Sequence, residues 1–157
     1  LANRVRLQDE YECFFLVADL HMLTTRTELE RLRETRQNIR DVVLDNLSVG
    51  IDPEKCTYVL QSAVPAIPQI ALILGMLTTV PRLQRVPTLK EVMQDLEIEQ
   101  PSYGLLGYPV LQAADILSVR AHLVPVGKDQ ASHLEVTREV ARRFNGLYGP
   151  TLPEPTR

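Results

Sequence analysis

Cys13-Phe14-Phe15-Leu16-Val17-Ala18 is an unbroken apolar run that ends at Asp19-Leu20-His21. A run of this length, bounded by polar residues, is typical of a parallel strand that is buried on both faces. Ligands of an open parallel sheet bind beyond the carboxyl ends of its strands, so Asp19 and His21 are candidate site residues. The pair has the composition of half a metal site, but no further ligand cluster accompanies it. We therefore expect His21 to line a pocket or to pack in the turn.

A charged helix and a second strand follow this run. Thr27 and Glu30 have the spacing of a capping box, which predicts a helix from there to about Ser48. Gly50 stands at a suitable position to end that helix. The β-rich residues 57–60 predict the second strand. This part of the chain therefore has the strand, helix, strand order of a parallel crossover unit.

The later residues add more helices and one more strand. Helices are predicted at 65–77, 82–86, 87–96, 108–117 and 130–144, a third strand at 121–126, and a linker at 149–157. The helix 65–77 is apolar on most sides, so it is either buried or packed against a partner. Asn145-Gly146 is expected to end the last helix. Alternation of strands and helices, repeated three times, predicts an α/β fold with parallel strands.

The composition is that of an ordinary globular protein. Of 157 residues, 45% are apolar and 24% are charged, which predicts one soluble unit with one core. The 17 basic and 20 acidic residues are dispersed along the chain, so they create no overall positive potential that would attract a polyanion. The apolar stretches are too short to cross a membrane. Cys13 and Cys56 each lie in an apolar run, which predicts reduced thiols, a cytoplasmic location and no metal bound through sulfur.

A glycine turn follows the third predicted strand, at Gly127-Lys128-Asp129-Gln130. The glycine permits close approach of the backbone, and the following helix offers free N–H groups, which together suit a ribose or a phosphate. Asp129 is able to accept hydrogen bonds from sugar hydroxyls, and Gln130 both donates and accepts. The alternative, that Asp129 only caps the helix, stays open.

One predicted helix carries a polar stripe. Tyr108, Gln112 and Asp115 fall on one face at positions i, i+4 and i+7, with alanines beside them. A phenol, an amide and a carboxylate suit a pocket that recognises the hydrogen-bonding groups of a substrate, and Val124 and Val126 are placed to close it with apolar surface. An ordinary exposed face with a contact between the glutamine and the aspartate is the alternative.

Motifs of several known enzyme classes are incomplete or absent. His133-Leu134-Glu135 has the H-x-E pattern of zinc deaminases, but no P-C-x-x-C follows it, so we expect a solvated helix face there. The sequence has no Walker A motif and no recognisable set of nucleophile, base and orienting residue, so we assign no catalytic residue and no metal ligand. This favours a reaction driven by positioning and charge.

Several segments together form a familiar pattern in a fixed order. They are Ala18–His21, Gly50–Pro53, Gln61–Pro65, Tyr108–Leu117, Val124–Gln130, His133–Arg138 and Ala141–Asn145. The joint pattern resembles the tryptophanyl-tRNA synthetases, a family of class I aminoacyl-tRNA synthetases. The resemblance implies a Rossmann-type parallel sheet with flanking helices. It also implies activation of L-tryptophan by ATP with Mg²⁺ held mainly by the ATP, release of pyrophosphate, and transfer to tRNA(Trp) without a covalent enzyme intermediate.

The resemblance also implies roles for the candidate residues. Asp115 would accept the indole N–H and select tryptophan, and Tyr108 and Gln130 would hold the α-ammonium group. The indole pocket would be lined by His21, Gln112, Ile116, Val124 and Val126, and the adenosine ribose would be bound by Gly127, Lys128 and Asp129. A helical segment at about 65–100 would supply much of a homodimer interface.

The pattern departs from the family in two respects. The HIGH-like motif belongs before Leu1, and the KMSKS-like loop and anticodon-binding region belong after Arg157. We therefore expect residues 1–157 to be a single unit from the middle of the catalytic domain, incomplete at both ends and inactive alone. Gln112 stands where many relatives have methionine, and the resulting Tyr-x-x-x-Gln-x-x-Asp is also typical of tyrosyl-tRNA synthetases. A tyrosine-activating enzyme, and a catalytically silent paralogue that binds an amino acid or a partner protein, stay open as alternatives.

Overall fold

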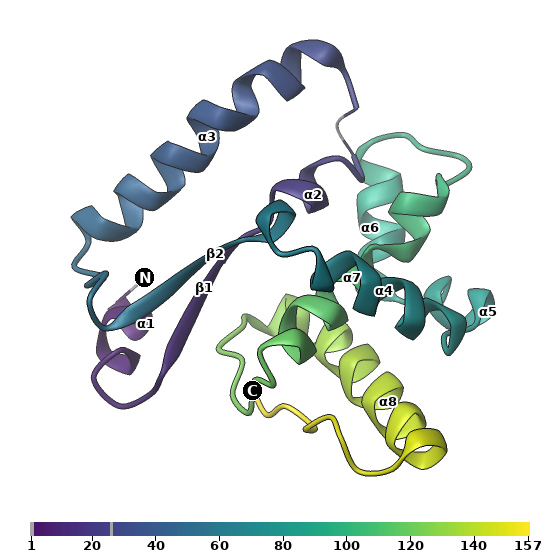
Figure 1. Cartoon of the computed structure of the whole chain (residues 1–157). Helices are drawn as coiled ribbons and strands as arrows, with labels where there is room; N and C mark the ends of the chain where they lie inside the picture. The colour runs from purple at the N-terminus through teal and green to yellow at the C-terminus, as the bar shows by residue number, and fades with distance from the viewer. Residues whose placement is uncertain (1, 26) are drawn as a thin grey trace. The chain divides into compact units, whose positions relative to one another are not determined.

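The structure is a computed structural model that describes residues 2–25 and 27–157 (Figure 1). The chain forms two compact units, Leu1–Val64 and Pro65–Arg157. The single unit expected for residues 1–157 stays a prediction, because compact units also occur within one domain.

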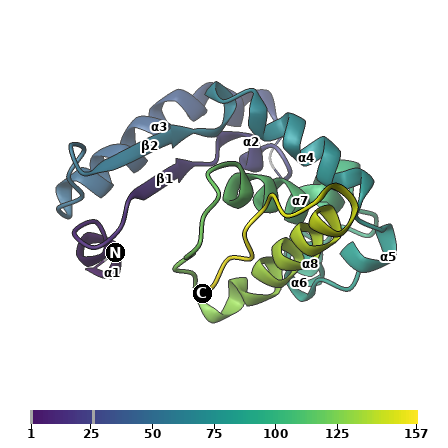
Figure 2. The ribbon, with the colours of Figure 1, turned by 60° about the horizontal axis from the view of Figure 1, so that its bottom comes forward.

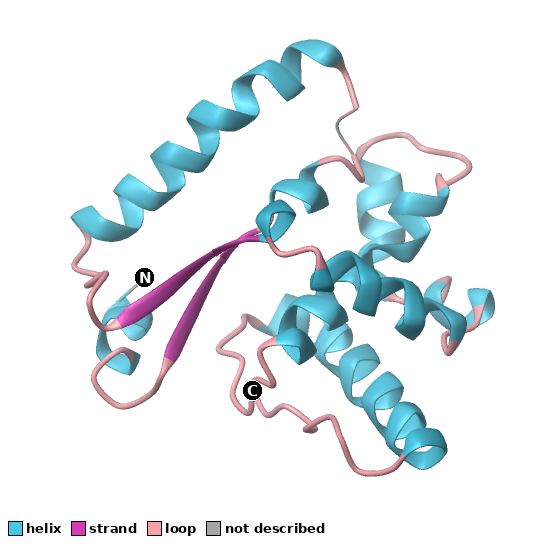
Figure 3. Cartoon of the chain, viewed as in Figure 1, coloured by secondary structure: helices cyan, strands magenta, loops and turns pink. Residues whose placement is uncertain are grey.

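The first unit contains a parallel two-stranded sheet. Its strands are β1 (Cys13–Val17) and β2 (Cys56–Leu60), which lie side by side with Cys13 opposite Cys56 (Figure 3). Both strand predictions are confirmed. The expectation that the first strand is buried on both faces is wrong, because Phe14 is 41% exposed and alternate residues of β1 are covered unequally. Within this unit, therefore, β1 is half-buried.

The helix α3 (Leu29–Ser48) connects the two strands and runs alongside them (Figures 1 and 2). Its N-cap is Glu28, and no side chain caps it. The predicted capping box is therefore wrong, since Thr27 lies one residue outside the N-cap and its hydroxyl is out of register with the free amides. At the other end, Gly50 has φ +100° and confirms the predicted stop, because this left-handed region favours glycine.

The second unit is helical around α7. Its elements are α4 (Ala66–Met76), α5 (Val80–Leu83), α6 (Pro87–Asp95), α7 (Tyr103–Ser118), the 3₁₀ turn η2 (Lys128–Gln130) and α8 (Ala131–Tyr148). Both α4 and α8 pack against α7. Val86, Leu89, Leu105 and Val136 are the buried residues of one core cluster, and the Tyr108 ring packs against it.

The helix α7 begins five residues earlier than predicted. A start at Tyr108 would put Pro109 in the first turn of the helix, a position that proline favours. Instead, the hydroxyl of Ser102 accepts a hydrogen bond from the Leu105 amide (3.1 Å) and caps the helix, which leaves Pro109 buried in its interior. The cap and the buried packing outweigh the missing donor of the proline.

The third predicted strand, 121–126, is wrong. This segment is a loop with a single parallel bridge, between Leu123 and Thr156. Pro125 has no amide to donate, which prevents a regular ladder. Figure 2 shows the C-terminal segment (yellow) returning beside this loop, so residues 149–157 are not the linker that we expected.

The helix α8 also extends past its predicted end. Asn145 and Gly146 lie within it, and Gly149, with φ +90°, follows its last residue. Asn145 does not break the helix because its side chain serves the next segment. Its amide oxygen accepts hydrogen bonds from the Thr151 and Leu152 amides, both at 2.9 Å.

Among the described residues, no helix is both long and apolar enough to span a bilayer. In the same part of the chain, no three or more His, Cys, Asp or Glu side chains gather as a metal site would require.

Candidate functional site

The polar stripe of α7 is not a solvated face. Asp115 is only 8% exposed, and Ala113 and Ala114 beside it are fully buried. Tyr108 and Gln112 are half-buried. The exposed-face alternative is therefore wrong for Asp115. A carboxylate that is shielded from water makes stronger hydrogen bonds than an exposed one, which suits selection of a ligand N–H group.

The apolar candidates lie on the same helix and on the loop that follows it. Ile116 is the residue after Asp115 on α7 and is 8% exposed. Val124 and Val126 are half-buried in the loop, and the Val124 amide donates to the Thr156 carbonyl (2.9 Å). The C-terminal segment thus fixes the backbone of the loop at one of its two valines.

Half-buried Tyr108 contacts His133, a buried residue of α8. The His133 Nε2 atom lies 2.7 Å from the Tyr108 hydroxyl oxygen, and the ring centroids are 5.1 Å apart. Burial, with a smaller effect of Glu91, raises the pKa of Tyr108 to about 12, against a hydrogen bond with Thr88 that lowers it. The phenol is therefore neutral at physiological pH and keeps its hydrogen.

The solvated face that we expected at His133 is wrong, since this residue is 1% exposed. Its buried neighbours on α8 are Val136, Thr137 and Val140, at i+3, i+4 and i+7. That helical period is the signal by which the sequence marks His133 as a core residue.

The turn at Gly127 favours glycine because another group lies close to its Cα atom, and not because its backbone is left-handed. Gly127 has φ −64°, which any residue adopts, but an added Cβ would collide with the Asp129 carboxylate. Asp129 does not cap α8, whose N-cap is Gln130, so the capping alternative is wrong. A hydrogen bond from Gln130 Nε2 (2.8 Å) lowers the pKa of Asp129. The turn presents an ionised carboxylate to solvent, with exposed Lys128 beside it.

In the first unit, a buried glutamine joins the carboxyl ends of the two strands. The Gln61 Oε1 atom accepts from the backbone amides of Leu20 (3.1 Å) and His21 (3.2 Å), and its Nε2 lies 3.3 Å from His21 Nδ1. These amides belong to the first turn of α2 (Asp19–Met22), so Gln61 satisfies groups that a helix start leaves free. His21 lies at the end of the first strand, as predicted, and Gln61 follows the second strand, another strand end at which sequence reasoning places candidate residues.

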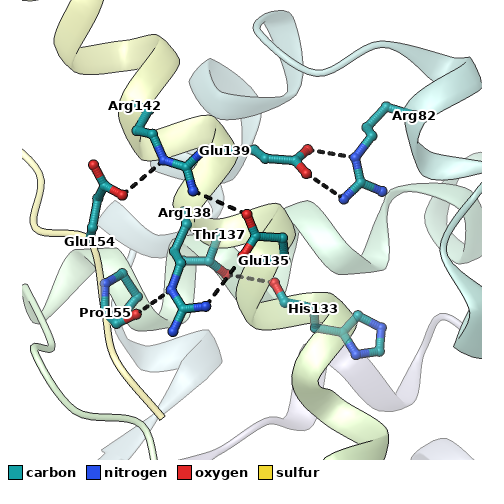
Figure 4. A network of polar contacts seen from close by, with 9 residues as sticks. All are labelled: Arg82, His133, Glu135, Thr137, Arg138, Glu139, Arg142, Glu154 and Pro155. Carbon is teal, nitrogen blue, oxygen red and sulfur yellow. Dashed lines mark hydrogen bonds and ion pairs between the residues drawn. The ribbon is translucent and has the colours of Figure 1, made fainter.

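Charged side chains hold α8 to its surroundings (Figure 4). Glu135 contacts Arg138 and Arg142, and Arg142 also contacts Glu154. Burial raises the pKa of Glu135, but hydrogen bonds from the two arginines outweigh it and lower the pKa. Through Arg142, these contacts connect α8 to Glu154 in the C-terminal segment.

Comparisons with known proteins give one consistent result. A profile of the family described as tRNA synthetases class I (W and Y) matches residues 1–156. The tryptophan–tRNA ligase of Treponema pallidum is 57% identical over 99% of this chain and 46% of its own length. That of Chlamydia caviae is 50% identical over 99% of this chain and 46% of its own length.

Solved structures agree in fold. A tryptophanyl-tRNA synthetase from Campylobacter jejuni, complexed with ADP and tryptophan, superposes with a TM-score of 0.86 at 35% identity, over 99% of this chain and 48% of its own. A tyrosyl-tRNA synthetase from Archaeoglobus fulgidus, complexed with L-tyrosine, gives 0.74 at 23% identity, over 95% and 44%, and shows the fold alone. These neighbours confirm the predicted Rossmann-type α/β class. The chain spans about half the length of the curated relatives that it matches.

Proposed function

This chain belongs to the class I tRNA synthetases for tryptophan and tyrosine, and from that premise we propose that the protein containing it activates L-tryptophan with ATP and transfers it to tRNA(Trp). The observation that carries this proposal is the 57% identity, along nearly the whole chain, to a tryptophan–tRNA ligase. The burial of Asp115 supports it independently, because a selective hydrogen bond to an indole N–H requires a shielded acceptor.

In this proposal, α7 and the turn bind the amino acid. Asp115 accepts the indole N–H, and Tyr108 and Gln130 contact the α-ammonium group. Gln112, Ile116, Val124 and Val126 line the indole pocket. A buried hydrogen-bonding site of this kind rejects analogues that lack the group, because its own acceptor is then left unpaired.

The turn binds the nucleotide. Gly127 lets the backbone approach the ribose, Asp129 accepts its hydroxyl hydrogens, and Lys128 adds a positive charge at an exposed position. ATP arrives as its Mg²⁺ complex. The tryptophan carboxylate attacks the α-phosphorus, a P–O bond forms to give tryptophanyl-adenylate, and the bond to pyrophosphate breaks. The side chains named here act by positioning and charge, and none of them is bonded to the substrate during the reaction.

The helical segment at 65–100 supplies much of a homodimer interface in this proposal. Large apolar side chains of α4 are exposed, with Leu72 at 58% and Met76 at 74%. Exposed apolar side chains gathered on one helix mark interaction surfaces. The protein acts in translation, which places it in the cytoplasm.

Amino-acid-dependent exchange of pyrophosphate into ATP tests the proposal. In the whole protein that contains this chain, tryptophan should support exchange with a higher kcat/KM than tyrosine. Faster exchange with tyrosine would instead favour a tyrosine-activating enzyme, to which the Tyr108, Gln112 and Asp115 spacing is also suited. Binding of an amino acid without exchange would indicate the catalytically silent paralogue.

A further inference from the structure

The contact between Tyr108 and His133 restricts the direction in which the hydroxyl hydrogen of Tyr108 points. The two polar atoms are 2.7 Å apart, and the histidine is 1% exposed. The Thr137 hydroxyl donates to the His133 carbonyl (3.0 Å), which places a second polar contact on the same turn of α8. Thr88 of α6 also hydrogen-bonds Tyr108, and its Oγ1 lies 3.2 Å from Ser132 Oγ. The phenol therefore has polar partners on both α6 and α8.

The hydrogen-bonding capacities of these groups determine what each one does. A phenol has one hydrogen to donate and two lone pairs to accept with, whereas an ammonium group only donates. Tyr108 can therefore hold an α-ammonium group only through a lone pair, and its own hydrogen must go elsewhere. The Nε2 atom of a neutral histidine accepts such a hydrogen. A hydroxyl donating from Thr88 leaves one lone pair of the phenol for a ligand.

We propose that His133 is a positioning residue: its Nε2 accepts the Tyr108 hydroxyl hydrogen and so orients an oxygen lone pair toward the α-ammonium group of the bound amino acid. This inference rests on the proposed function, because it assigns a partner to the residue that contacts the ammonium group. His133 does not touch the substrate. Its effect is confined to ligands that carry the ammonium group.

A pair of ligands tests this confinement. Indole-3-propionate is tryptophan without its α-ammonium group, so it shares the indole and carboxylate contacts and lacks only the contact with Tyr108. In His133→Phe, which keeps an aromatic ring and removes the acceptor, the Kd of tryptophan should rise about tenfold, as expected for loss of one hydrogen bond to a charged group. The Kd of indole-3-propionate should change by less than about twofold.

Three further variants separate positioning from packing. His133→Gln supplies an amide oxygen as acceptor and should restore tryptophan binding to within about threefold of the unsubstituted protein. Tyr108→Phe should show the same selective loss as His133→Phe, and the double variant should lose no more than Tyr108→Phe alone, because both changes remove one interaction. Equal weakening of both ligands, or losses that multiply in the double variant, would overturn the proposal.

A measurement on the unsubstituted protein does not depend on whether the variants fold. The ¹⁵N chemical shifts of the His133 ring should show Nε2 without a hydrogen and Nδ1 with one. The opposite tautomer, with the hydrogen on Nε2, would make Tyr108 the acceptor and would contradict the inference. Failure of the unsubstituted protein to bind either ligand would count against the proposed function itself, a result distinct from the others.

Discussion

The helix α7 and the turn Gly127–Gln130 carry the two halves of the candidate site, but they are held in different ways. Eight of the 16 residues of α7 are buried, whereas Gly127, Lys128 and Asp129 are all exposed. Within the turn, the Gln130 amide donates to the Gly127 carbonyl (3.2 Å), and the Gln130 side chain donates to Asp129. In the proposed site, recognition by α7 would therefore depend on packing away from the ligand, and recognition by the turn on contacts between near neighbours.

The largest effect is expected from a cavity under α7. Leu105 is 1% exposed and belongs to the core cluster, so Leu105→Ala should lower the free energy of unfolding by about 2–5 kcal/mol. Leu32→Ala on α3 is the matched control, because Leu32 is 40% exposed and should cost at most about 0.5 kcal/mol. Urea denaturation followed by circular dichroism measures both. Similar losses at the two positions would contradict the contrast in packing.

The next effect is expected at Asp115, the residue of α7 that is proposed to select tryptophan. Asp115→Ala removes the shielded acceptor and should lower kcat/KM for tryptophan about 10-fold to 150-fold, the loss of about 1.5–3 kcal/mol for a hydrogen bond to a charged group. Pyrophosphate exchange measures this. Asp115→Asn keeps the volume without the charge and serves as the control for packing. If the alanine variant retains full selectivity for tryptophan over tyrosine, Asp115 is not the selecting residue.

Features that depend on residues close together in the chain could be predicted from the sequence. Both strands, α3 with its Gly50 stop, and the polar stripe on α7 follow from hydrophobic period and cap chemistry. The predicted start of α7 failed because Ser102 offered a cap upstream of Pro109. More than one residue near a helix start is able to determine where the helix begins, and the packing of the helix decides between them.

Contacts between residues that are far apart in the chain could not be predicted from local sequence patterns. Tyr108 and His133 are 25 positions apart, and Gln61 and His21 are 40 apart, so no local pattern pairs them. The third predicted strand failed partly for a local reason, the missing amide of Pro125, and partly because, within the described residues, 121–126 make a single bridge, to Thr156. The helical period around His133 is a signal of its burial, although we expected a solvated face there, and no pattern indicates its partner.

A smaller effect is expected in the turn. Gly127→Ala places a Cβ against the Asp129 carboxylate, so the carboxylate must move. It is able to do so because it is the flexible end of a side chain. The KM for ATP should rise about threefold to tenfold as one ribose contact weakens, and the KM for tryptophan should stay nearly constant. Gly146→Ala in α8 is the control, because nothing lies within 4 Å of its added Cβ. An unchanged KM for ATP in Gly127→Ala would remove the turn from the nucleotide site.

The smallest effect is expected on α8, the helix that follows the turn and packs against α7. Arg82 of α5 makes two hydrogen bonds to Glu139 of α8, at 2.5 and 2.9 Å, and its side chain is 24% exposed. Glu139 is 39% exposed, so solvent screens the pair, and Arg82→Gln should lower the free energy of unfolding by about 0.5–1 kcal/mol.

High salt sharpens this last test. If the ion pair stabilises α8 mainly by charge, the difference between Arg82→Gln and the unsubstituted protein should shrink in about 1 M salt, where charges are screened within about 3 Å. Arg142→Gln is the comparison, because Arg142 is 50% exposed and should contribute less although it has two acidic partners. A loss at Arg82 as large as that at Leu105 would mean that surface charge, and not the core around α7, fixes the helix on which the turn depends.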